Sequence, residues 1–388
     1  MNLIQKLKAD GPKRILALDG GGIRGALTIG YLEKIENILR LRYNNPNLRL
    51  CDYFDLIGGT STGSIIAAAL AIGKEVSEIK ELYLRLGEKV FTKNKRWWTR
   101  VWRATFSETQ LKAELESLFG DLTFGHNEGH PPVQSGDSSI KTGLCIVTKR
   151  ADTGSTWPII NHPDGTFFSD NRGMLLRGVI RASTAAPTYF ESEKLEVGEG
   201  QVGVFVDGGV SMANNPALQL FLIATLKGFP FHWPTGEEKL LLVSIGTGTW
   251  KPIVGVDTVT GASKLSWAER VPSILMNDAN AQNQLLLQYL SKTLTPWKID
   301  GEVGNLSDDL LTPEPALTYL RYNARLETNP LQTLGLGSLV TKLDSLRKME
   351  VGGNCQDLIT IGERAAQCDV VPEHFPSVFD VAGESDHP

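Results

Sequence analysis

The apolar positions of the chain recur in two alternating patterns that predict strands followed by helices. Residues 14–18 form a short apolar run that stops at glycines, which is typical of a buried strand. Apolar residues then recur at helical spacing until about Tyr43, and the alternation repeats with a strand at 53–58 and a helix that begins at Ser64. Strands and helices alternating at these lengths predict an α/β fold with a parallel sheet and right-handed crossovers.

The same patterns extend into the C-terminal half of the chain. Further strands are expected at 144–148, 202–206, 239–245 and 317–322. Further helices are expected at 76–90, from the capping box Ser107-x-x-Gln110 to Phe119, from Asn215-Pro216 to Leu226, and at about 266–292. Polar, glycine-rich composition predicts an exposed loop at 126–139, and the residues from about Pro372 are predicted to be a disordered tail.

Composition narrows the class of protein. The 388 residues are 41% hydrophobic and 21% charged, as in an ordinary soluble enzyme, and the net charge of −5 argues against a nucleic-acid partner. The four cysteines are widely spaced and the histidines are not clustered, so we expect no metal site and no disulfide framework. We see neither a signal peptide nor a run of the about 20 apolar residues that span a bilayer, so a cytoplasmic location is expected.

A candidate nucleophile lies in Gly59-Thr60-Ser61-Thr62-Gly63, which has the form G-x-S-x-G. Between a strand and a helix this pattern is typical of a serine on a sharp turn, with glycines where the backbone is crowded. The alternative is an ordinary strand-to-helix turn in which Ser61 caps the helix. We favour the nucleophile, because an apolar strand precedes Ser61 and an apolar helix follows it.

A candidate anion site lies in the first glycine turn, which runs from Asp19 to Gly25. The amides of Gly20, Gly21 and Gly22 carry no Cβ to obstruct them, so they can stabilise an oxyanion, with Arg24 orienting the loop or adding positive potential. The alternative is a phosphate loop of a nucleotide-binding, ATPase-like protein. The chain lacks G-x-x-x-x-G-K-[ST], which weakens that alternative.

A candidate base is Asp207, which follows an apolar strand and precedes two glycines. The six histidines are predicted to lie in turns, in the loop or in the tail, and none has an obvious acidic residue to orient its ring, although His232 follows a helix at a position that a hydrolase could use. A buried carboxylate at the edge of the sheet could take the proton of Ser61 directly. The alternative is a simple Asp-Gly turn at the end of a strand.

A basic aromatic segment at 91–103 contains five cations, Trp97, Trp98 and Trp102, and no acidic residue. Tryptophan favours the membrane interface and clustered cations favour anionic lipid, so this segment is a candidate for membrane docking or for a lid. The alternative is an insertion whose indoles pack on the core.

Together these motifs resemble the patatin-like phospholipase family. The resemblance lies in the turn 19–25 as oxyanion motif, in 59–63 as nucleophile elbow and in Asp207-Gly208-Gly209 as the aspartate motif, and the segments 53–58 and 181–187 agree with it. It implies a three-layer α/β/α fold with a mainly parallel sheet, in which 12–220 is the catalytic core and 221–388 is an extension that completes the sheet.

The resemblance also implies a function. Ser61 would be the nucleophile and Asp207 the general base of a lipid acyl hydrolase that needs no metal or other cofactor and meets its phospholipid or other acyl-lipid substrate at the membrane surface. A soluble carboxylesterase is the alternative within the same chemistry. Some bacterial members are switched by a nucleotide signal or a partner, so a small-molecule or protein activator is a further expectation, and a homo-oligomer is compatible with the sequence.

Overall fold

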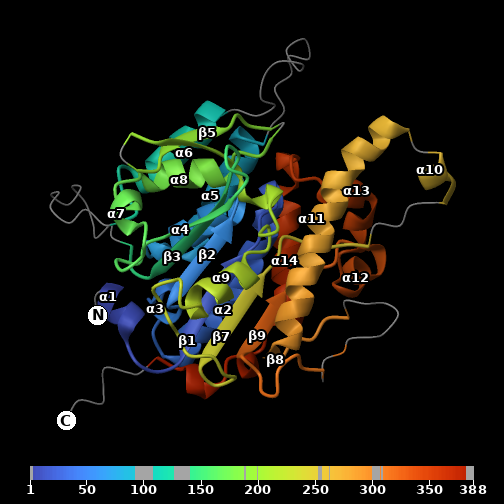
Figure 1. Ribbon diagram of the computed structural model, residues 1–388. Coiled ribbons are helices and arrows are strands. Elements are labelled where there is room, and N and C mark those ends of the chain that lie inside the picture. Colours follow the sequence, from blue (N-terminus) through green and yellow to red (C-terminus); the bar gives the residue numbers. More distant parts are fainter. Residues whose placement is uncertain are drawn as a thin grey trace.

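The computed structural model describes residues 3–91, 108–125, 140–187, 189–198, 200–251, 256–261, 263–298, 306 and 309–381. Within these residues a single nine-stranded sheet runs through the centre of the molecule, with helices on both of its faces (Figure 1). The chain therefore has the three-layer α/β/α architecture that its sequence predicts.

The sheet has the strand order β5-β6-β3-β2-β1-β7-β9-β8, and β4 pairs with β3 outside this path. The pairs that link β3, β2, β1, β7, β9 and β8 are parallel, whereas β3–β4, β3–β6 and β5–β6 are antiparallel. The strands are β1 Lys13–Leu18, β2 Leu56–Thr60, β3 Gly143–Arg150, β4 Thr156–Ile160, β5 Glu193–Glu196, β6 Val202–Asp207, β7 Leu240–Ile245, β8 Ser291–Thr293 and β9 Leu317–Tyr322. The mainly parallel sheet confirms the predicted fold class, and three of its strands come from the C-terminal part of the chain.

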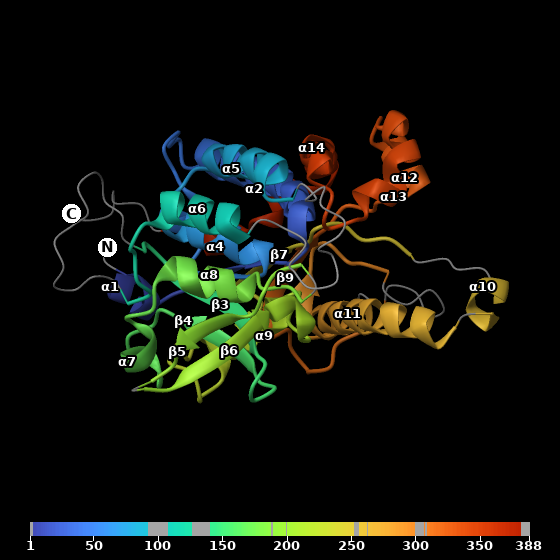
Figure 2. The ribbon, with the colours of Figure 1, turned by 90° about the horizontal axis from the view of Figure 1, so that it is seen from above.

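Helices cover the two faces unequally. Seen from above, α2, α5 and α14 lie on one side of the sheet, and α9 and α11 lie on the other (Figure 2). The helices of the first face are α2 Gly25–Arg42, α4 Thr62–Ala71, α5 Val76–Lys89, α6 Glu108–Phe119, α8 Leu176–Ser183 and α14 Cys355–Asp369. Those of the second face are α1 Leu3–Lys8, α9 Ala217–Thr225 and α11 Lys264–Tyr289. Short helices complete the chain at α3 Leu50–Tyr53, α7 Phe168–Asn171, α10 Val256–Thr260, α12 Thr328–Thr333 and α13 Leu343–Leu346.

The central strands are buried on both faces, which explains their continuous apolar sequences. In β1, Leu16 and Leu18 pack into the larger core under α2 and α14, whereas Ile15 and Ala17 pack into the smaller core under α9. Successive side chains of a strand point to opposite faces, so a strand between two helical layers needs apolar residues at every position.

The strands β2 and β6 meet end to end along the same edge of β3. Thr60, the last residue of β2, lies opposite Val147, and Asp207, the last residue of β6, lies opposite the next residue, Thr148. The other edge of β3 is taken by β4, so β2 and β6 must share one edge. The two carboxyl ends therefore face each other. Asp207 therefore reaches Ser61 from a strand, β6, that runs antiparallel to β3. From the sequence alone this strand was expected to be one of the parallel strands.

Three predicted boundaries were wrong. Residues 53–54 were expected in a strand, but Tyr53 ends α3 and β2 begins only at Leu56. Lys292 was expected in the long helix, but that helix ends at Tyr289 and Lys292 lies in β8. The disordered tail expected from about Pro372 is also wrong for the described residues 372–381, which include short 3₁₀ helices and the fully buried Phe379.

Two other sequence features fall outside the described residues. The predicted loop at 126–139 lies there, and so does Ser107 of the predicted capping box, although the helix after it is present as α6. The described helices include none that is both long and apolar enough to cross a bilayer.

Candidate active site

Ser61 occupies a strained turn between β2 and α4. Its backbone has φ 52° and ψ −129°, a conformation that residues other than glycine rarely adopt. The two flanking glycines make this turn possible, because a Cβ at Gly59 would collide with the carbonyl oxygen of Gly63, and one at Gly63 with that of Leu18. Ser61 thus lies on a sharp strand-to-helix turn that the glycines at 59 and 63 permit.

Ser61 and Asp207 are in direct contact. The Ser61 hydroxyl donates a hydrogen bond of 2.5 Å to Oδ2 of Asp207, and the amide of Gly209 donates one of 2.7 Å to Oδ1. Burial raises the pKa of Asp207 to about 6, although both hydrogen bonds and the charge of Arg181 act in the opposite direction. A carboxylate with this pKa is a stronger base than an exposed aspartate, yet it is still ionised at neutral pH.

A second serine supports the elbow from behind. The Ser61 amide donates a hydrogen bond of 2.9 Å to Oγ of Ser183, whose own hydroxyl donates one of 2.6 Å to the carbonyl of Val147. Ser183 ends α8 and is fully buried. This bridge ties the strained turn to β3, the strand that also carries β6.

The three glycines of the first turn are not equivalent. The Gly20 amide donates to the carbonyl of Asn214 at 3.0 Å, so it is already occupied. Gly21 and Gly22 line the same cavity as Ser61, and no hydrogen bond among the described residues takes up their amides. The first residue of the following helix, Thr62, also lines this cavity. The oxyanion donors expected from sequence therefore reduce to Gly21 and Gly22, and Thr62 joins them as a new candidate.

Arg24 lies behind the glycine turn and does not line the cavity. Its guanidinium packs over the ring of Trp250, 5.0 Å from the centroid, and only 7% of the residue is exposed. Burial lowers the pKa of Arg24 to about 10, against the opposing charges of Asp19 and Glu350. This placement fits an orienting and electrostatic role, and not contact with the reacting atoms.

The C-terminal half of the chain fixes the glycine turn. Asp19 forms a buried bidentate ion pair with Arg321 of β9, with distances of 2.9 and 2.6 Å. The hydroxyl of Thr247, just beyond β7, donates to the Gly20 carbonyl at 3.0 Å. The supporting roles of Arg321, Thr247, Asn214 and Ser183 could not be predicted from the sequence, because single polar residues near strand ends carry no periodic signal.

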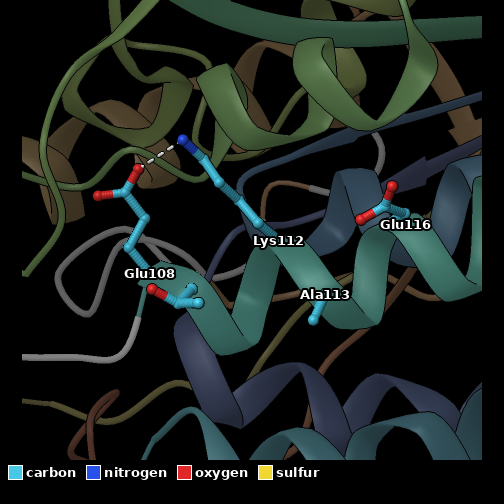
Figure 3. Close-up of a pocket in the computed structure, with 5 residues that line it drawn as sticks. Glu108, Lys112, Ala113 and Glu116 are labelled. Atoms are coloured by element: carbon cyan, nitrogen blue, oxygen red, sulfur yellow. Dashed lines mark ion pairs between the residues drawn. The ribbon is translucent and has the colours of Figure 1, made fainter.

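Ser61 and Asp207 both line a cavity of about 1340 Å³. Its walls are mostly apolar, and they include Ile65, Phe91, Tyr189, Phe190 and Leu275. A cavity with apolar walls and a few converging polar groups is typical of a ligand site, and its volume is large enough for a lipid acyl chain. A second hollow, of about 360 Å³, lies on α6, where Glu108 pairs with Lys112 at 2.8 Å (Figure 3). Its described lining contains no serine, cysteine or histidine.

Histidine takes no part in the site as far as the structure describes it. His162 is buried against the ring of Phe231, and His374 contacts the hydroxyl of Tyr322 at 2.9 Å. His232 lies near the carbonyl of Lys227 and is exposed. None of these three lines the cavity, so the base expected from sequence, Asp207, has no described imidazole beside it.

The tryptophans proposed for membrane docking are not placed. Trp97, Trp98 and Trp102 lie outside the described residues. The described residues also contain no cluster of His, Cys, Asp and Glu side chains that could hold a metal ion.

Known proteins resemble this chain over most of its length. A family model described as patatin-like phospholipase matches residues 16–221. Patatin-like protein 2 of Arabidopsis thaliana is 30% identical over 337 residues, which are 78% of this chain and 77% of that protein. A cUMP-AMP-activated phospholipase of Escherichia coli is 28% identical over 89% of this chain and 97% of its own length. A cGAMP-activated phospholipase of Escherichia coli strain TW11681 is 29% identical over 260 residues, and the match spans 65% of each chain.

Proposed function

Since the chain belongs to the patatin-like phospholipase family, we propose that it is a lipid acyl hydrolase that cleaves fatty-acyl esters of glycerophospholipids with Ser61 and Asp207. One observation carries this proposal: the Ser61 hydroxyl lies 2.5 Å from a buried carboxylate whose pKa is about 6, beside two glycine amides in an apolar cavity. A hydroxyl needs a base to become a nucleophile, and the developing oxyanion needs donors nearby.

In the acylation step, Oδ2 of Asp207 takes the proton of Ser61 while Oγ attacks the ester carbonyl carbon. The carbonyl oxygen becomes an oxyanion that accepts hydrogen bonds from the amides of Gly21 and Gly22. When the intermediate collapses, the bond to the alcohol oxygen breaks. The carboxyl group of Asp207 returns its proton to that oxygen, and an acyl-serine and a lysophospholipid result.

Deacylation repeats these steps with water. Asp207, now ionised again, takes a proton from a water molecule that attacks the acyl-serine. The same amides hold the second oxyanion, and its collapse expels Oγ of Ser61, which recovers the proton from Asp207. The fatty acid leaves and the site is restored. One carboxylate therefore acts as base and then as acid in both halves of the reaction.

A fluorophosphonate probe and lipid analysis test this proposal together. Wild type should be labelled and should release fatty acid from phosphatidylcholine in mixed micelles. Ser61→Ala should lose both, and Asp207→Ala should be labelled much more slowly. Ser77→Ala, on the exposed face of α5, is the matched control and should behave as wild type. Labelling of the Ser61→Ala variant at the wild-type rate would contradict the proposal.

The two alternatives make different predictions. A soluble carboxylesterase would hydrolyse a short-chain nitrophenyl ester but not micellar phospholipid. An ATPase-like protein would be stabilised thermally by Mg-ATP. The ATPase-like alternative is disfavoured by the contacts of the glycine turn. Arg321 binds both carboxylate oxygens of Asp19, and the Gly20 amide donates to the carbonyl of Asn214. The turn is therefore left with few free groups to bind a phosphate.

We also propose that a cyclic nucleotide activates the enzyme, which acts from the cytoplasm at the membrane surface. The support is the similarity to two phospholipases named for activation by cGAMP and by cUMP-AMP. Phospholipid hydrolysis should rise when one of these nucleotides is added, and the same nucleotide should bind to the Ser61→Ala variant in calorimetry. Binding of neither nucleotide would contradict this part of the proposal and leave the hydrolytic part standing.

A further inference from the structure

The first half of α11 carries an apolar stripe that faces solvent. Trp267, Val271, Ile274 and Leu275 follow each other at spacings of i, i+4, i+7 and i+8, which places them on one face of the helix. Their exposed fractions are 41%, 41%, 43% and 62%. This half of α11 extends away from the sheet, with α10 beyond its end (Figure 2). A helix in a soluble protein ordinarily buries such a stripe.

A second pair of exposed apolar residues lines the same cavity and lies beside α11. Val210 and Met212 follow Asp207 by three and five residues, and 57% and 63% of them are exposed. Asn283 of α11 donates a hydrogen bond of 2.7 Å to the carbonyl of Met212, which fixes this loop against the helix. We call these two residues together with the stripe on α11 the apolar rim.

The apolar rim is continuous with the interior of the cavity. Val271 and Leu275 from α11 line the cavity that contains Ser61, and so do Val210 and Met212. The same surface therefore runs from exposed side chains at the opening to the walls around the nucleophile. Exposed apolar patches of this kind mark interaction sites.

We propose that the apolar rim is the surface by which the enzyme docks on a lipid bilayer. This inference rests on the proposed function, because the bilayer is chosen as the occupant that supplies substrate. A protein partner seated on the rim would close the opening to Ser61. A bilayer in the same place would let an acyl chain pass from the membrane into the cavity without crossing water, where exposure of its apolar surface is unfavourable.

The physical mechanism is that of an interfacial helix. The stripe on α11 enters the boundary between headgroups and acyl chains while the rest of the helix stays with the protein. Trp267 lies at the end of the stripe farthest from the cavity residues, and tryptophan is the side chain that most favours this boundary.

Vesicle binding tests the proposal without depending on turnover. In a Ser61→Ala background, binding to vesicles of phosphatidylethanolamine and phosphatidylglycerol is measured by sedimentation, with and without cGAMP or cUMP-AMP. The double variant Trp267→Ser/Ile274→Ser changes two rim residues that do not line the cavity. Its partitioning should weaken by more than about tenfold, given the transfer free energy of two large apolar side chains.

The matched control is the double variant Ile4→Ser/Leu41→Ser. These residues are 41% and 83% exposed, and they lie on α1 and at the end of α2, away from the cavity opening. The control should bind vesicles as the parent does. With Ser61 restored, the rim variant should lose hydrolysis of vesicle phospholipid and keep wild-type turnover of a soluble nitrophenyl ester.

Three outcomes would overturn the docking surface. The first is undiminished vesicle binding by the rim variant, and the second is an equal loss in the control. The third is a parent that sediments as a dimer while the rim variant is monomeric, which would make the rim a contact between two copies of the chain. Failure of the proposed function has a separate signature, in which wild type binds vesicles through the rim but releases no fatty acid from vesicles or mixed micelles.

Discussion

Arg321 and Asp19 are 302 positions apart in the sequence, and they form a buried bidentate ion pair at the carboxyl ends of β9 and β1. Only about one twentieth of either side chain is exposed, and Arg321 also donates to Ser244 at 2.7 Å. Because Asp19 begins the turn that contains Gly21 and Gly22, a strand from the C-terminal half fixes the amides that we propose as oxyanion donors.

Removal of Arg321 should therefore destabilise the fold and slow catalysis. Arg321→Met leaves the Asp19 carboxylate buried without a partner, which should lower the free energy of unfolding by about 3–5 kcal/mol. The double variant with Asp19→Asn should lose less than the single one, since no unpaired charge remains. Urea unfolding of the four proteins in this cycle measures both values. Lys342→Met, which breaks an exposed pair with Asp357, should change stability by less than about 1 kcal/mol.

Activity should follow the ionisation of Asp207. The proposed reaction needs the carboxylate form of Asp207, and burial raises the pKa of this group to about 6. Turnover of a soluble ester should therefore rise with pH, reach half of its maximum near pH 6 and level off above pH 7. Rates measured with a short-chain nitrophenyl ester, on enzyme checked for folding at each pH, give the profile. A midpoint near the ordinary aspartate value of about 4 would contradict the role of burial.

The same pKa predicts a pH-dependent stability. The folded pKa of about 6 lies above the usual value of 3.8, so the folded state binds the proton of Asp207 more tightly than the unfolded state does. Ionisation therefore destabilises the fold as pH rises from about 4 through 6, by about 3 kcal/mol at the upper end. Asp207→Asn cannot ionise, so it should gain stability relative to wild type above pH 6 and gain little at pH 4. Equal differences at both pH values in thermal unfolding would contradict this.

Ser183 should act as a positioning residue. Ser183→Ala leaves the amide of Ser61 buried without its acceptor, at a cost of about 1–3 kcal/mol. Because the strained turn then loses its support, kcat should fall while KM for a soluble ester stays near the wild-type value. Ser77→Ala again serves as the control. A rise in KM with kcat unchanged would indicate a role in substrate binding instead.

The C-terminal segment should contribute to stability. Phe379 is fully buried, and its carbonyl accepts a hydrogen bond of 3.2 Å from Arg14. Phe379→Ala should lower the free energy of unfolding by about 3–5 kcal/mol. Its neighbour Val378 is 39% exposed, and Val378→Ala should have an effect of less than about 1 kcal/mol. Similar values for the two variants in urea unfolding would mean that this segment behaves as the tail expected from sequence.

The elements predicted correctly are those with strong local patterns. The strands β1 and β9 and the helix α2 have continuous or periodic apolar residues bounded by glycine or polar residues, and the structure has them almost as predicted. The short strands β4 and β5 were missed, because their side chains are half-exposed and they pair only at the antiparallel end of the sheet. Tyr53 was misplaced because an apolar residue before a strand has the same local signature as a residue within it.

The candidate site was predictable to a similar degree. Ser61 lies between two glycines whose spacing predicts a sharp turn, and Asp207 ends a strand that is recognisable from its apolar residues. The occupied amide of Gly20 could not be predicted, since its acceptor, Asn214, is 194 positions away. The same holds for Arg321, because only the completed sheet brings β9 within reach of the first turn.

The end-to-end meeting of β2 and β6 on β3 has a consequence for substrate range. The ends of β2 and β6, which carry the two proposed catalytic residues, pair with successive residues of a third strand, Val147 and Thr148, and their spacing does not depend on the residues that line the cavity. Exchanges along the cavity wall, at positions such as Leu275 or Phe190, can therefore remodel which acyl chain fits without altering the distance over which the proton travels. This arrangement leaves specificity free to diverge while the chemistry stays constant.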